Sequence, residues 1–344
     1  MKISNVASIV NTKIDASILT THTYISTECM LPNCGGIENC SSIPNGKVTS
    51  FDKNDILLSN IRPYFKKLWF STRSGGCSND VICLRVANRE CLPKYLYYAL
   101  CTDKFIDSFS ASSKGTKMPR GDKNALLTYE IPDRNMEDQL HIVDILGSID
   151  NSIENNEEQI NKINALAMSF VKKGDNPHAE LKPYIKFIKG KKPIENGSTS
   201  APYLSIDAIT SFRYESVYSD DMIMATPYDI LMVMDGASSG TVFSHQSGVV
   251  SSTLAKIESK KEIKDYLYWF LLSLKDTIKT RNTGSAIPHA NKDYISSLKF
   301  DYEFATNASN TTFLHSLRTK IVSLQEEIVK LRELKALYLK KFFE

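Results

Sequence analysis

Residues 142–170 read IVDILGSIDNSIENNEEQINKINALAMSF, and residues 314–338 read LHSLRTKIVSLQEEIVKLRELKALY. In each stretch apolar side chains recur at alternating steps of three and four residues, over four or more heptads and without an internal proline. This spacing is typical of a coiled coil, whereas most amphipathic helices merely cover a globular core. We therefore predict two helices of about 30–35 residues, each roughly 45–50 Å long.

The predicted seam consists mainly of isoleucine and leucine, with polar interruptions at Asn156 and Lys335. Polar seam positions of this kind fix the register of a helix pair at some cost in stability. A globular segment lies between the two helices and could return the chain for an antiparallel pair; parallel pairing and pairing with another subunit are the alternatives. The residues assigned to helix or partner contacts are Ile142, Leu146, Ile149, Ile153, Ile160, Ile163, Leu317, Ile321, Leu324, Ile328 and Leu331.

The chain also repeats itself outside the helices. The segment DIL at 55–57 recurs at 229–231, KYLYYAL at 94–100 resembles DYLYWFL at 265–271, and GTKMP at 115–119 resembles GSAIP at 284–288. The offsets of 174, 171 and 169 residues keep the copies colinear, which indicates a duplicated domain rather than a solenoid repeat. The predicted domains are 1–134 and 174–303, followed by helices at 135–173 and 304–344.

Each globular copy mixes short strand-like runs with one clear helix. Predicted strands lie at 55–60, 67–70, 81–86, 229–234, 241–243, 253–257 and 298–302, and predicted helices at 93–109 and 261–280. Strands and helices do not alternate regularly, so the predicted fold class is α+β.

The amino-acid composition indicates the general class of protein. The 344 residues are 42% apolar and 24% charged, as in an ordinary globular protein of two domains. No apolar run reaches transmembrane length and the N-terminus lacks a secretory pattern, so we expect a cytoplasmic protein. The seven cysteines are odd in number and contain no CxxC pair. We therefore expect free thiols rather than disulfides, and no metal site.

No pattern of residues predicts catalysis. The sequence contains no P-loop, no GxGxxG after a strand, no GxSxG and no HExxH, and its six histidines are scattered. We therefore expect no enzymatic activity and no cofactor bound to this chain.

Basic residues gather in loops that occupy matching places in the two copies. The first copy has 17 basic and 12 acidic side chains, and the second has 15 and 16. Glycine-rich loops with lysine, arginine, serine and threonine suit phosphate contacts, although solvated loops have the same composition. The candidate phosphate-contact residues are Arg62, Lys66, Lys67, Lys114, Lys117, Arg120 and Lys123 in the first copy, with Lys279, Arg281, Ser285 and His289 in the second.

Taken together, the duplicated architecture resembles the DNA-specificity subunit of type I restriction–modification enzymes. Residues 131–142, IPDRNMEDQLHI, resemble that family's proline-rich entry into its helix, with an acidic residue followed by glutamine at Asp138-Gln139. Residues 55–64, DILLSNIRPY, and 115–119, GTKMP, resemble segments of its target-recognition domains. The second helix departs from this pattern, because Thr306-Asn307 stands at the offset of the acidic-glutamine pair.

The resemblance implies two similar target-recognition domains separated by two long helices that form an antiparallel coiled coil. It implies that each domain reads one half of a bipartite, asymmetric double-stranded DNA target. The implied partners are two DNA-methyltransferase subunits, which carry S-adenosylmethionine, and ATP-driven restriction subunits. Two alternatives are a specificity-like subunit of another methyltransferase or defence assembly and a coiled-coil adaptor that binds protein instead of DNA.

Overall fold

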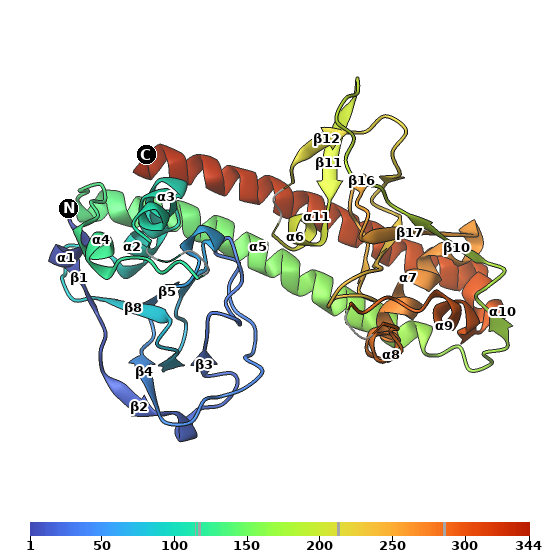
Figure 1. Ribbon diagram of the computed structural model, residues 1–344, viewed down its shortest axis with the longest axis horizontal. Coiled ribbons are helices and arrows are strands. Elements are labelled where there is room, and N and C mark those ends of the chain that lie inside the picture. Colours follow the sequence, from blue (N-terminus) through green and yellow to red (C-terminus); the bar gives the residue numbers. More distant parts are fainter. Residues whose placement is uncertain (114, 116–117, 212–213, 285–286) are drawn as a thin grey trace. The chain divides into compact units, whose positions relative to one another are not determined.

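The computed structural model describes residues 1–113, 115, 118–211, 214–284 and 287–344. The chain divides into two compact units. Unit 1 comprises residues 1–152 and 331–344, and unit 2 comprises residues 153–330. Each unit contains one globular copy and parts of both long helices, so we describe each unit separately (Figure 1).

Unit 1 contains two four-stranded sheets. The first is antiparallel throughout, and every residue of its inner strand β5 is buried, including the polar Ser59 at its end. The second contains one parallel pair, β3 with β7. In spatial order the first sheet is β1 (Ala7–Ile9), β8 (Val81–Val86), β5 (Ile56–Ser59) and β6 (Leu68–Phe70), and the second is β2 (Lys13–Asp15), β4 (Lys47–Phe51), β7 (Gly75–Cys77) and β3 (Tyr24–Ile25).

Short helices cover the core of unit 1. Tyr95, Leu96 and Tyr98 on α2 are fully buried against the first sheet, which accounts for the apolar composition of this repeated segment. The short helices and turns are α1 (Ile3–Val6), η1 (Ala16–Ile18), η2 (Pro63–Phe65), α2 (Pro93–Leu100), α3 (Asp103–Ala111) and α4 (Lys123–Thr128).

Unit 2 repeats this plan. Its first sheet is β10 (Ile185–Lys189), β17 (Leu254–Ser259), β14 (Ile230–Val233) and β15 (Val242–Phe243), and its second is β12 (Ser216–Tyr218), β11 (Ser200–Leu204), β16 (Gly248–Val250) and β13 (Met224–Ala225). A two-stranded sheet joins β18 (Lys299–Phe300) to β9 (Ala179–Glu180). The helices outside the long pair are α6 (Ile206–Ser211), η3 (Lys261–Ile263), α7 (Lys264–Ser273), α8 (Lys275–Thr280), α9 (Lys292–Ser297) and α10 (Tyr302–Thr306).

The strand orders confirm the duplication and show where the copies diverge. The order β1-β8-β5-β6 in unit 1 and β10-β17-β14-β15 in unit 2 is the same when the four strands of each sheet are counted along the chain. In the second sheets, β7 and β16 each have one parallel and one antiparallel neighbour. The fourth strand pairs with the antiparallel neighbour in unit 1 but with the parallel neighbour in unit 2. The first sheet is therefore the shared scaffold, and the second is the variable one.

The two long helices, α5 (Met136–Val171) and α11 (Ala308–Phe343), contain 36 residues each. Unit 1 holds the beginning of α5 and the end of α11, where the Lys335 amine lies 2.5 Å from the Asp150 carboxylate. Unit 2 holds the end of α5 and the beginning of α11, where the rings of Phe170 and Phe313 are 4.7 Å apart. The helices therefore run antiparallel. The heptad pattern alone was compatible with antiparallel pairing, parallel pairing and pairing with another subunit.

The assigned seam residues differ in burial. Ile142, Leu146, Ile149, Ile321, Leu324 and Ile328 are buried, whereas Ile153, Ile160, Ile163, Leu317 and Leu331 are half-buried. Both polar seam positions are largely shielded from solvent. Asn156 is buried in unit 2, and Lys335 is paired with Asp150 in unit 1. No helix of the described part is both long and apolar enough to cross a membrane.

Three predictions are wrong at least in part. The helix predicted over 93–109 is broken after Leu100, because Thr102 accepts a hydrogen bond from the Phe105 amide and begins a new helix there. The helix predicted over 261–280 is likewise divided between α7 and α8 at Leu274. The prediction of free thiols is wrong for Cys29 and Cys40, which form a disulfide, whereas the other five cysteines are free.

Candidate nucleic-acid interface

The end of strand β5 is joined to a distant loop in unit 1. We call residues 62–66, after β5, and residues 236–240, after β14, the strand-exit loops; residues 115–120 and 284–289 are the Gly-Pro loops. The Arg62 amide donates to the Pro119 carbonyl at 2.9 Å, and the Gly121 amide donates to Asn60 at 3.1 Å. An isolated bridge joins Ile61 to Arg120. Backbone hydrogen bonds thus hold two loops side by side that are more than 50 residues apart.

Unit 2 repeats these bonds at the same offsets. The Gly236 amide donates to the Pro288 carbonyl at 2.9 Å, the Ala290 amide donates to Met234 at 2.9 Å, and a bridge joins Asp235 to His289. Each globular copy therefore presents the same pair of loops. The structure thus brings together residues that the sequence analysis had selected from separate loops.

In unit 1 the predicted contact residues differ in their availability. Arg62, Arg120 and Lys123 are exposed, although Arg120 also pairs with Asp80 at 2.8 Å. Lys66 is mostly covered and pairs with Asp103 at 2.8 Å. Lys114 and Lys117 lie outside the described residues.

Lys67 lies away from the exposed side of the loop. Its amine donates to the Thr27 carbonyl at 2.8 Å, and burial lowers the pKa of Lys67. The geometry therefore assigns Lys67 a structural contact within unit 1.

In unit 2 the predicted residues surround the equivalent loops. Lys279 is exposed at the end of α8, and the Arg281 guanidinium lies over the Tyr294 ring at 5.7 Å. His289 is exposed, and its Nδ1 lies 2.8 Å from the Asp235 carboxylate. Ser285 lies outside the described residues.

A basic strand beside this loop pair was missed by sequence reasoning. The Lys189 amine pairs with Asp235 at 2.8 Å, so Lys189 and His289 share one carboxylate. Burial opposes the shift, but the hydrogen bonds from Lys189 and His289 lower the pKa of Asp235. The run IKFIKGKK at 185–192 was the available signal, because its four lysines are all exposed and form a local basic strip in a copy that is nearly neutral overall.

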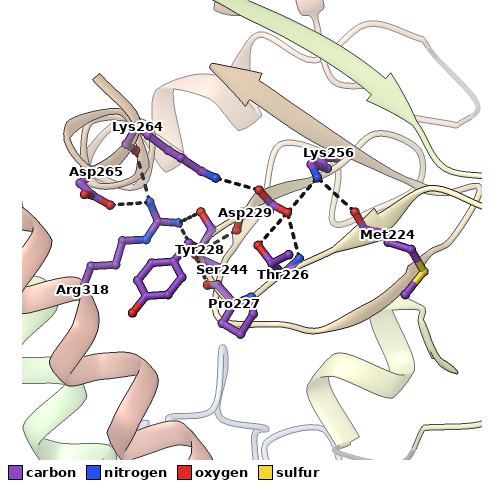
Figure 2. A network of polar contacts seen from close by, with 10 residues as sticks. All are labelled: Met224, Thr226, Pro227, Tyr228, Asp229, Ser244, Lys256, Lys264, Asp265 and Arg318. Atoms are coloured by element: carbon purple, nitrogen blue, oxygen red, sulfur yellow. Dashed lines mark hydrogen bonds and ion pairs between the residues drawn. The ribbon is translucent and has the colours of Figure 1, made fainter. Parts of the chain in front are cut away.

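A buried ion network supports the strand that leads to the loop of unit 2 (Figure 2). Asp229, immediately before β14, accepts hydrogen bonds from Lys264 at 2.8 Å and from the Thr226 amide at 2.9 Å, and pairs with Lys256 at 2.8 Å. Burial alone would raise the pKa of Asp229, but the two lysines hold it well below its usual range. In unit 1 the equivalent Asp55 is also buried and pairs with Arg85 at 2.6 Å.

Arg318 connects helix α11 to the same network. Its fully buried guanidinium donates to the Tyr228 carbonyl at 2.7 Å, to Ser244 Oγ at 2.6 Å and to Asp265 at 3.1 Å. Burial lowers the pKa of Arg318 and the Asp265 carboxylate opposes that shift. The contact ties the beginning of β14 to the long helix, so the strand-exit loop extends from an anchored strand.

The site offers hydrogen-bond donors, positive charge and exposed apolar groups. Within the described ranges no three His, Cys, Asp or Glu side chains lie close enough together to hold a metal ion. Fold and site together define a duplicated α+β protein with paired long helices and a polar, partly basic loop surface on each copy.

Comparison with known proteins identifies the family. The family model for the type I restriction modification DNA specificity domain matches twice, over residues 11–165 and 181–302. The chain therefore belongs to the family of type I restriction–modification DNA specificity domains.

One curated relative and one solved structure illustrate the likeness. The chain is 36% identical over 126 residues to the type I restriction enzyme MjaVIII specificity subunit of Methanocaldococcus jannaschii; the match spans 34% of this chain and only 29% of that relative. The crystal structure of the type I restriction–modification S subunit from M. genitalium superposes with a TM-score of 0.56 at 18% identity, covering 100% of this chain and 95% of that one. The structural likeness supports the fold.

Proposed function

We propose that this chain is the sequence-specific DNA-binding subunit of a type I restriction–modification enzyme. It reads a bipartite, asymmetric duplex target, with one half-site for each globular copy. The observation that carries the proposal is the repeated loop pair: backbone hydrogen bonds join the same two loops in each copy, but the side chains on them differ. Two readers of different chemistry require two different half-sites.

The surface of the loops fits a polyanion. Arg62, Arg120 and Lys123 in unit 1 and Lys279 and Arg281 in unit 2 are exposed, and phosphate contacts of this kind supply affinity without sequence information. Base edges in the major groove would supply the specificity. In this proposal the antiparallel helices α5 and α11, parts of which belong to each unit, would correspond to an unread gap between the half-sites.

The proposal assigns catalysis to other subunits. Two DNA-methyltransferase subunits would bring S-adenosylmethionine, and restriction subunits would hydrolyse ATP. This chain would bind neither cofactor, and its role would be to direct those subunits to their target.

The first experiment is methylome sequencing of a host that expresses this chain with its methyltransferase subunit. We expect one methylated motif with two dissimilar halves separated by a fixed gap. The motif should disappear when this chain is omitted. Methylation that does not depend on this chain, or a motif without two halves, contradicts the proposal.

Salt-dependent binding provides an independent test. Replacing Arg62 and Arg120 with alanine should weaken binding to all duplexes and reduce the slope of log K against log salt by roughly 1.8, since each lost phosphate contact removes about 0.9. The matched control is Lys162→Ala, which removes an exposed lysine from α5 that pairs with Glu158. Absence of salt-dependent DNA binding in the wild-type chain would favour a protein adaptor.

A further inference from the structure

The two strand-exit loops share a backbone path but not a surface. Arg62 and Lys66 have positive φ angles of 49° and 54°, and the equivalent Gly236 and Gly240 have φ angles of 103° and 86°. The amide of the fourth loop residue donates to the carbonyl of the first at 3.0 Å in both copies. The loops thus share a positive φ at their first and fifth residues and one turn hydrogen bond, although no residue is shared between them.

The left-handed conformation has different costs in the two loops. Glycine adopts a positive φ freely, whereas another residue pays about 1–2 kcal/mol. A methyl group added to Gly236 would meet nothing within 4 Å, so conformation rather than crowding favours glycine there. Copy one accepts this cost twice. The left-handed conformation of Lys66 is explained by its ion pair with Asp103. Arg62 has no ion pair among the described residues, and its side chain is exposed.

Between the two strained positions, copy one displays a pair of aromatic rings. Tyr64 is 50% exposed and Phe65 is 41% exposed, and their ring centroids are 4.8 Å apart. A neighbouring segment fixes the backbone of this loop. The Asn33 amide donates to the Phe65 carbonyl at 3.0 Å, and the Cys34 amide donates to the Lys66 carbonyl at 2.8 Å. Exposed rings on a fixed backbone are available for a contact that the described part of the chain does not itself make.

Copy two has no rings at these positions. Ser238 and Ser239 replace Tyr64 and Phe65, and Ser239 is buried where it accepts a hydrogen bond from the Asn282 amide group at 2.8 Å. Both Gly-Pro loops nevertheless expose an apolar side chain, Met118 at 52% and Ile287 at 57%. The strand-exit loops therefore differ in displaying aromatic rings in copy one and serines in copy two.

We infer that the Tyr64–Phe65 pair contacts base edges in the half-site read by unit 1 and is a specificity determinant of that half-site. The inference rests on the proposed function and assigns the reading residues within it. Exposed Arg62 precedes the rings in the same loop, and exposed Arg120 lies on the Gly-Pro loop that is hydrogen-bonded to it, which suits a ligand that carries both phosphates and apolar base edges. Aromatic side chains make apolar contacts with the thymine methyl group in the major groove. Unit 2 reads its half-site without rings.

The test gives unit 1 the loop side chains of unit 2 through the double variant Tyr64→Ser/Phe65→Ser. Expressed with the methyltransferase subunit, it should methylate a motif in which one half is relaxed at one or two positions and the other half is unchanged. Discrimination at each relaxed position should fall by up to about 5- to 150-fold, the range that corresponds to the cost of one mismatched base pair. Ile18→Ala, which removes an apolar side chain that is 72% exposed elsewhere in unit 1, should leave the motif intact.

The other outcomes are distinct. If the wild-type chain directs no bipartite methylation, the proposed function fails. If the wild type does so and the double variant keeps every motif position with unchanged affinity, the ring inference is overturned. An unchanged motif with weaker retention of the methyltransferase subunit during size-exclusion chromatography overturns it too, because the rings would then contact protein. Circular dichroism and urea unfolding of the variant establish that it folds.

Discussion

Arg318 is the residue whose removal should reveal how unit 2 is anchored to helix α11. The variant Arg318→Met keeps a side chain of similar length but removes the charge and the donors to Tyr228, Ser244 and Asp265. Breaking a buried charged contact costs about 3–5 kcal/mol, since the Tyr228 carbonyl and the buried Ser244 hydroxyl lose their charged donor. Asp265 is partly exposed and keeps its contact with His315, so the loss arises mainly at the Tyr228 carbonyl and Ser244.

The two tryptophans, Trp69 and Trp269, allow each unit to be followed separately. In a Trp69→Phe background, the fluorescence of Trp269 reports unfolding of unit 2 in urea. With an m-value of about 2 kcal/mol/M, a loss of 3–5 kcal/mol shifts the midpoint by roughly 1.5–2.5 M. The control is Lys320→Met on the exposed side of α11, which should shift it by less than about 0.5 M. An Arg318→Met midpoint within that same range would refute the anchoring role.

Two further predictions concern titrating groups. Burial and the nearby Arg318 charge lower the pKa of His245 to about 3, so below pH 6.5 the unfolded chain binds a proton that the folded chain does not. Urea unfolding of unit 2 should therefore show about 2 kcal/mol less stability at pH 5 than at pH 8. The variant His245→Gln should abolish that difference. Burial alone would lower the pKa of Lys335, but the nearby Asp150 carboxylate opposes this, and the net pKa lies above the ordinary value of 10.5. The ion pair therefore stabilises unit 1 fully below pH 10.5, and this stabilisation is lost as the pH rises through the raised pKa of the folded state. Lys335→Met should cost unit 1 about 1–3 kcal/mol, and adding Asp150→Asn should recover part of that loss; equal stability of the single and double variants would contradict this account.

Much of the architecture was readable from the sequence because the signals are local and repeated. The heptad seam and the matching segments at 55–57 and 229–231 predicted the long helices and the duplication, and each predicted strand lies where a strand or part of one is found. Helix breaks were missed because they depend on single capping contacts such as that of Thr102. Short strands such as β3 and β13 were missed because two residues carry no periodicity.

By itself the sequence determined the repeat, the two long helices, the α+β class and the basic composition of the loops, because each of these is encoded by neighbouring residues or by identity at a fixed offset. Only the tertiary structure decided which loops lie together, that Lys189 shares Asp235 with His289, and that Tyr64 and Phe65 stand exposed between two left-handed residues, Arg62 and Lys66. It also paired Cys29 with Cys40. These contacts join residues that are distant in the sequence, or they depend on backbone angles. Neither property produces a periodic pattern in the amino-acid sequence.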